Sequence, residues 1–133
     1  MDERLFTPDE VEALIPRLTD LVERLREAHE AVVAVRERLQ AEQRRLALAG
    51  GGVLYQARWR ADQAELETAT TRAQTLVDEL HEMGGVAKDL QLGLVDFPHL
   101  KDGRIVNLCW KYGETHVRWW HGLDEGFAAR KPL

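Results

Sequence analysis

Residues able to hold a divalent metal ion gather in the last forty residues of the chain. His121 and Asp124 are three positions apart, and Asp96 comes from an earlier segment that can fold back beside them. One imidazole with two carboxylates is a ligand set that divalent transition metals accept. We therefore predict a metal site formed by Asp96, His121 and Asp124. The structural alternative is that His121 ends a strand and Asp124 caps the following turn.

The single cysteine, Cys109, admits two interpretations. A nucleophilic thiol needs a nearby base, which His116 or His121 on a neighbouring strand could supply. A free cysteine inside a strand is also common as a small buried hydrophobic residue. If the metal site exists, Cys109 is a neighbour of the ion or its fourth ligand. One cysteine excludes an internal disulfide and a cysteine-rich zinc module.

An anionic ligand is the third chemical hypothesis for this region. Lys88 and Arg130 carry positive charge and could clamp an anion. Together with Asp96 and Cys109 they form the predicted ligand-binding set. The alternative is that Lys88, its neighbour Asp89 and Arg130 make structural ion pairs.

A helix begins near the N-terminus. Thr7 supplies a capping hydroxyl, Pro8 suits the first helical position, and Glu10 is placed to complete a capping box. Pro16 falls inside the helical pattern and removes one backbone hydrogen bond. We therefore expect a kink or a short break near residue 16.

Two long helices are predicted over residues 17–48 and 54–83. Leucine, valine and alanine recur in each at steps of three and four, the spacing of a coiled-coil seam. Glycines at 50–52 predict the turn between them. Residues 1–85 are therefore expected to form an antiparallel helical hairpin. A lone hairpin leaves part of its seams exposed, so we also expect a homodimer through the hairpin.

The periodicity changes after residue 85. Alternating residues and turn signals predict three antiparallel strands at Leu94–Phe97, Arg104–Lys111 and Thr115–His121, followed by an irregular tail. The expected fold class is α+β, with a small three-stranded meander in residues 86–133 packed as one domain with the end of the hairpin. This meander would carry the candidate site.

Composition excludes several classes of protein. The net charge of −5 is concentrated in residues 1–85, which sum to −6, so general nucleic-acid binding is not expected. No apolar run approaches the roughly 20 residues of a membrane span, and the acidic N-terminus lacks a secretory signal pattern. We expect a cytoplasmic protein with no membrane or nucleic-acid partner.

Several motifs resemble one protein family. They are FTPDEVEALIP near the N-terminus, then ELHEMGGVAKDLQLGLVDFP, NLCWKYGE and WWHGLDEGFAARKPL. These segments are similar to an uncharacterised bacterial family known as domain of unknown function 2203. The resemblance covers nearly the whole chain and implies that Lys88, Asp96, Cys109, His121, Asp124 and Arg130 belong to the family's characteristic motifs. It implies no particular activity.

Two functions therefore remain open from the sequence. The first is a small metal-binding protein or metal-dependent enzyme, with a divalent transition metal in the C-terminal region and an unidentified small-molecule ligand. The second is a non-catalytic dimeric adaptor that uses the hairpin and a tryptophan-rich sheet surface. Whether the protein is an enzyme is not decided by these residues.

Overall fold

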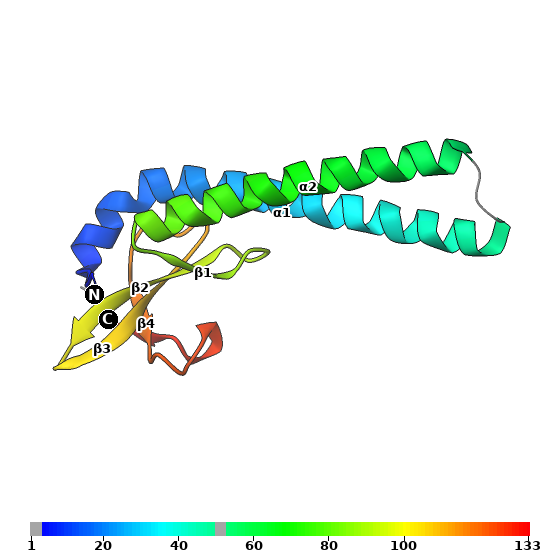
Figure 1. Cartoon of the computed structure of the whole chain (residues 1–133). Helices are drawn as coiled ribbons and strands as arrows, with labels where there is room; N and C mark the ends of the chain where they lie inside the picture. The colour runs from blue at the N-terminus through cyan, green and yellow to red at the C-terminus, as the bar shows by residue number, and fades with distance from the viewer. Residues whose placement is uncertain (1–3, 50–52) are drawn as a thin grey trace. The chain divides into compact units, whose positions relative to one another are not determined.

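The computed structural model describes residues 4–49 and 53–133 of the chain. In these residues two long helices are followed by a five-stranded antiparallel sheet (Figure 1). In chain order the elements are α1 (Pro8–Ala49), α2 (Val53–Glu82), β1 (Val86–Asp89), β2 (Leu94–Lys101), β3 (Arg104–Lys111), β4 (Trp119–His121), η1 (Phe127–Ala129) and β5 (Lys131–Pro132). The predicted α+β fold class is confirmed. The turn predicted at residues 50–52 lies outside the described residues.

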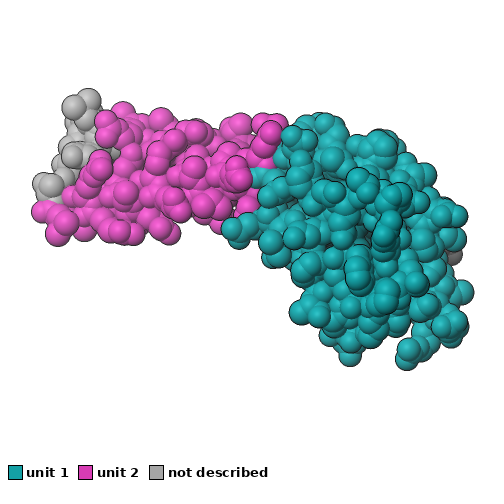
Figure 2. Space-filling model, turned by 180° about the vertical axis from the view of Figure 1, so that it is seen from behind, with its two compact units in different colours: residues 1–26, 76–133 teal, residues 27–75 magenta. Residues whose placement is uncertain are grey.

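The chain divides into two compact units (Figure 2). Unit 1 comprises residues 1–26 and 76–133, and unit 2 comprises residues 27–75. Unit 1 therefore contains the whole sheet with the first turns of α1 and the last turns of α2. Neither helix, over the residues described, is apolar enough along its length to cross a membrane.

The start of α1 is the predicted capping box. The backbone N–H of Glu10 donates to the Thr7 hydroxyl at 3.2 Å, and the N–H of Thr7 donates to the Glu10 carboxylate at 3.0 Å. These reciprocal bonds satisfy two backbone donors that a helix start otherwise leaves unpaired. The helix continues through Pro16, so the prediction of a short break is wrong. The ribbon of α1 does change direction in its first turns (Figure 1).

Replacing Thr7 with alanine is expected to lower the free energy of unfolding by about 1 kcal/mol, because the cap of α1 is lost. Urea denaturation followed by circular dichroism measures the change. Thr68→Ala is the matched control, since its hydroxyl bonds only to the Ala64 carbonyl inside an exposed stretch of α2. That variant should stay within about 0.5 kcal/mol of the parent chain. Equal losses in both variants would contradict a capping role.

The apolar seam predicted along α1 is buried within the described residues. On α1 its members are all buried: Leu18, Leu21, Leu25, Ala28, Val32, Val35 and Leu39. In unit 2 the same spacing continues from Leu39 to Glu42, which is 7% exposed and shares the seam with Asp62 of α2 at 9%. The two helices of the hairpin therefore cover much of each other's apolar stripe. The homodimer stays a prediction.

The five strands pair in chain order, β1-β2-β3-β4-β5. β3 has the predicted bounds, and β2 begins as predicted but extends to Lys101. β1 and β5 were not predicted. The third predicted strand begins only at Trp119, because the segment before it bonds to a helix instead. Glu12 of α1 accepts hydrogen bonds from the Val117 backbone and pairs with His116.

One face of the sheet packs against the helices of unit 1 and forms the core. Phe97 of β2 meets Phe6 edge to face, with ring centroids 5.2 Å apart. Gly84, two residues after the end of α2, has a φ of +98°, and a Cβ there would lie 2.2 Å from the Phe6 ring. Only glycine fits both the backbone and the space. In the register of β2 and β3, Leu108 and Trp110 share this face.

Candidate functional site

The opposite face of the sheet brings three of the predicted site residues together. Asp96 of β2 stands directly opposite Cys109 of β3, and His121 of β4 stands opposite Asn107, two residues from Cys109. Partners and alternate residues of paired strands lie on the same face. The side chains of Asp96, Cys109 and His121 therefore converge on one side, away from Phe97.

These three side chains lie close together and deep in the protein. One ligand atom from each lies within 4.8 Å of the others. Each residue is only 2% exposed. Among the described residues this is the one group of three histidine, cysteine or acidic side chains with metal-ligand spacing.

The histidine ring is held in one orientation. Its Nδ1 lies 2.8 Å from the carbonyl oxygen of Gly122, which can only accept a hydrogen bond. Nδ1 therefore carries a proton, and Nε2 is the remaining ring nitrogen. Nε2 lies 3.1 Å from the Asp96 carboxylate. Two lone pairs do not attract each other, so this contact needs either a proton between the two groups, carried by the ring or by the carboxyl group, or a cation shared by both.

The carboxylate of Asp96 is only partly satisfied. Its Oδ1 bonds to His121, whereas Oδ2 is buried without a hydrogen-bond partner of acceptable geometry. An unpaired buried carboxylate oxygen is costly. Burial, followed by the negative charge of Asp96, raises the pKa of the Cys109 thiol to about 12. Without a metal, this thiol is a poor nucleophile at neutral pH.

Arg130 closes the edge of the sheet beside this group. Its Nη2 donates to the Cys109 carbonyl at 3.0 Å and to both carboxylate oxygens of Glu114, at 2.7 and 2.9 Å. Glu114 in turn accepts from the Lys111 backbone N–H at 2.7 Å. The Arg130–Glu114 ion pair thus supplies hydrogen bonds to backbone groups of Cys109 and Lys111 in β3. These residues lie beyond Asn107 and Leu108, where β3 pairs with β4. The guanidinium also lies over Trp119 and Phe127.

Besides Arg130, two further predicted residues lie outside the group of three. Asp124 is exposed in the turn after β4, and Lys88 is exposed on β1. The bond that closes the turn comes from Glu125, whose carboxylate accepts from the Gly122 N–H and the Lys131 ammonium, both at 2.7 Å. The hydrogen bond from Lys131, followed by the one from the Gly122 backbone, lowers the pKa of Glu125. The structure therefore joins Cys109, rather than Asp124, to Asp96 and His121.

Residues 4–133 match the model of a family described as "Uncharacterized conserved protein (DUF2203)". The chain belongs to this family. The family predicted from the sequence motifs is therefore confirmed, and the match includes every residue of the candidate group. Comparisons with curated proteins and with solved structures found no match.

A second titratable pair in this DUF2203 chain, Glu42 and Asp62, was not predicted from the sequence. Burial, followed by a hydrogen bond with Asp62, raises the pKa of Glu42. Arg38 pairs with Asp62 at 3.2 Å and also with Glu65. The signal was present in the sequence, because Glu42 follows Leu39 at the spacing of the helical seam. The pair lies in unit 2, whereas the candidate metal ligands lie in unit 1.

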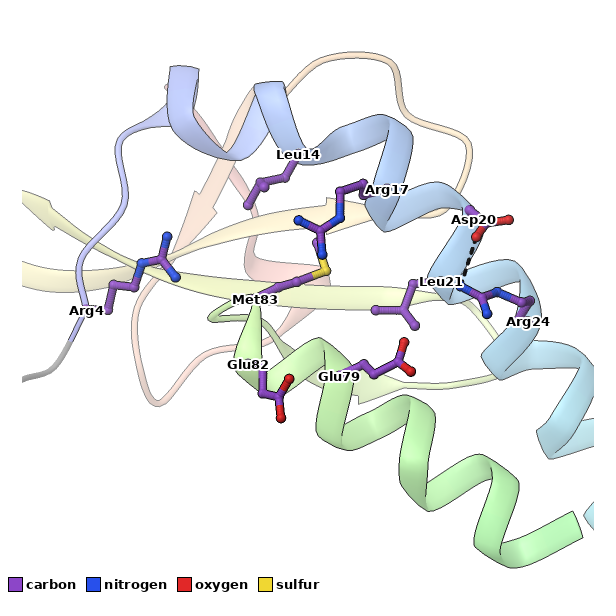
Figure 3. Close-up of a pocket in the computed structure, with 9 residues that line it drawn as sticks. All are labelled: Arg4, Leu14, Arg17, Asp20, Leu21, Arg24, Glu79, Glu82 and Met83. Carbon is purple, nitrogen blue, oxygen red and sulfur yellow. Dashed lines mark ion pairs between the residues drawn. The ribbon is translucent and has the colours of Figure 1, made fainter. Parts of the chain in front are cut away.

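A hollow of about 600 Å3 lies between the helices of unit 1 in this DUF2203 chain (Figure 3). α1 contributes Arg17 and Arg24, and α2 contributes Glu79 and Glu82. Arg24 is paired with Asp20 at 2.9 Å. Acidic and basic side chains are equal in number around this hollow. Its charge therefore favours neither an anionic nor a cationic ligand. It is also lined by none of the candidate metal ligands.

Proposed function

We propose that this protein binds a divalent transition metal through Asp96, Cys109 and His121. The observation that carries the proposal is the orientation of His121. Its Nδ1 donates to a backbone carbonyl while Nε2 faces a carboxylate with an unsatisfied oxygen. Metal-binding histidines commonly donate their second ring N–H to such a carbonyl, which fixes the ring and its tautomer.

The distances in the group fit one ion. A zinc ion lies about 2.0–2.3 Å from nitrogen, oxygen and sulfur ligands, so two ligands of one ion are at most about 4.6 Å apart. The three ligand atoms fall within 4.8 Å of one another, and the Nε2 to carboxylate distance is 3.1 Å. Small side-chain movements would therefore complete the site.

The ligand types favour a transition metal over calcium or magnesium. A thiolate and an imidazole are soft or borderline donors that suit zinc, iron or copper, whereas calcium and magnesium prefer oxygen ligands. Binding would also release the thiol proton of Cys109, because thiolate is the ligand form. Three protein ligands leave a fourth position for water or a small molecule. A reduced thiol ligand fits a reducing compartment, so we also propose a cytoplasmic location.

The test is metal analysis of protein purified without an affinity tag. The expected result is about one transition-metal ion per chain, retained through gel filtration. Cys109→Ser and Asp96→Asn keep the side-chain volumes and should each lower metal affinity at least about tenfold. Circular dichroism establishes that these variants are folded.

Asp124→Asn is the matched control, because Asp124 is a nearby but exposed carboxylate. It should keep the metal content of the parent protein. If the parent chain takes up no zinc, iron or copper on reconstitution, the proposal fails. It also fails if Asp124→Asn loses as much metal as the two buried variants.

A further inference from the structure

A groove of about 500 Å3 lies where β1 meets the end of α2 and the segment before α1. Val86, Pro98 and Ile105 line it from β1, β2 and β3, and Leu123 lines it from the turn after β4. The volume falls within the range of about 300–1,000 Å3 that is typical of small-molecule sites. The groove is therefore large enough for a ligand.

The apolar side chains of the groove are unusually accessible. Ile105 is 37% exposed, Val86 is 42% exposed and Leu123 is 63% exposed. Apolar side chains that gather at one exposed place often mark a binding surface, whereas single ones need no explanation. The groove therefore favours a ligand with a hydrocarbon part.

The remaining side chains of the groove supply nitrogen donors. They are Arg4, from the segment before α1, and His81, in the last turn of α2. The residues that line the groove, all within the described part of the chain, include no aspartate or glutamate. This differs from the balanced charges of the hollow in Figure 3, which Arg4 also borders. The charge of the groove suits an anion.

Arg4 is held in place by an aromatic ring. Its guanidinium carbon lies 4.7 Å from the centroid of Phe6, which is itself packed on Phe97. Stacking uses the flat face of a guanidinium and leaves the N–H groups at its edge free to bind a carboxylate by two hydrogen bonds. The arginine is thus partly ordered before a ligand arrives.

We propose that this groove binds the anion of an apolar carboxylic acid. The carboxylate pairs with Arg4, and the hydrocarbon part covers Val86, Ile105 and Leu123. The groove adjoins the proposed metal site, since Val86 is the strand partner of Asp96. Binding in the groove does not require a metal, so this inference goes beyond the proposed function and does not rest on it.

The test is calorimetric titration of the full chain, freed of metal by chelation, with decanoate. Decanol and decylammonium have the same hydrocarbon chain and serve as comparison ligands. Decanoate is expected to bind at least about tenfold more tightly than either, because only it forms a charge-assisted pair. Arg4→Gln should weaken decanoate binding about tenfold and leave decanol binding unchanged.

Two substitutions at facing positions of the β2–β3 pair locate the ligand. Leu100 and Ile105 are strand partners and both exposed, but only Ile105 lines the groove. Ile105→Asp places a negative charge in the groove and should weaken decanoate binding more than about tenfold, whereas Leu100→Asp should change it less than about twofold. Equal effects of the two substitutions, or no preference for decanoate, would overturn the proposal. So would a dimer that Ile105→Asp dissociates, because the groove would then be covered by a second copy.

Discussion

Replacing Phe97 with alanine is expected to lower the free energy of unfolding by about 3–5 kcal/mol. The Phe97 ring is fully buried and meets Phe6 edge to face, with an angle of 74° between the ring planes. Alanine would leave a cavity between β2 and the segment that leads into α1. Because whole domains are stable by only about 5–15 kcal/mol, this variant loses a large share of its stability. Urea denaturation followed by far-UV circular dichroism measures it.

Leu100→Ala is the control for Phe97→Ala. Leu100 lies on the same strand but is 54% exposed, so its loss should change stability by less than about 0.5 kcal/mol. A double-mutant cycle of Phe6→Ala with Phe97→Ala should give a coupling of about 0.5–1.5 kcal/mol from the paired rings. A loss below about 1 kcal/mol for Phe97→Ala would show that β2 is not anchored on the helices in this way.

In protein freed of metal, Cys109 should make the free energy of unfolding fall above pH 9 by up to about 1.4 kcal/mol per pH unit. The pKa of its thiol is raised in the folded chain from 9.0 to about 12. Between these values the folded chain keeps a proton that the unfolded chain has released. A raised pKa stabilises the fold below the unfolded value, and this stabilisation is lost as the pH rises toward the folded value. Urea denaturation at a series of pH values measures the slope.

The matched variant for this titration is Cys109→Ala. Lysine and tyrosine side chains also titrate at alkaline pH, but they are common to both proteins. The difference between the two pH profiles therefore isolates Cys109. We expect the alanine variant to have a flatter profile between pH 9 and 12. Parallel profiles would mean that the thiol is not protected from ionisation.

The sequence predicted the elements whose signals are local. The capping box at Thr7 and Glu10 is complete within four residues, and the seam repeats over many turns. β3 was found with its bounds because its residues alternate and a turn precedes it. β5 was not predicted because it has only two residues, Lys131 and Pro132, which are too few to show the alternation of a strand. The segment before Trp119 was wrongly extended as a strand because its partner, Glu12, is 105 positions from Val117.

The candidate site was predictable only in part. Asp96 and His121 were predicted as neighbours, and the structure brings them together. The choice between Cys109 and Asp124 as the third member depends on strand register, because Cys109 must face Asp96 directly. Register depends on pairing between strands, which a single sequence does not specify. Burial, and the hydrogen bond from His121 to the backbone, likewise require the folded chain.

The alternation of β2 and β3 has a consequence for how the family can change over evolutionary time. Phe97 and Trp110 face the core, while their neighbours Asp96 and Cys109 face the candidate site. Point substitutions can therefore alter one face and leave the other in place. Insertion or deletion of one residue within either strand exchanges the faces beyond it, because the side-chain period is two. Where no β-bulge absorbs the extra residue, such a change removes core and site in a single step.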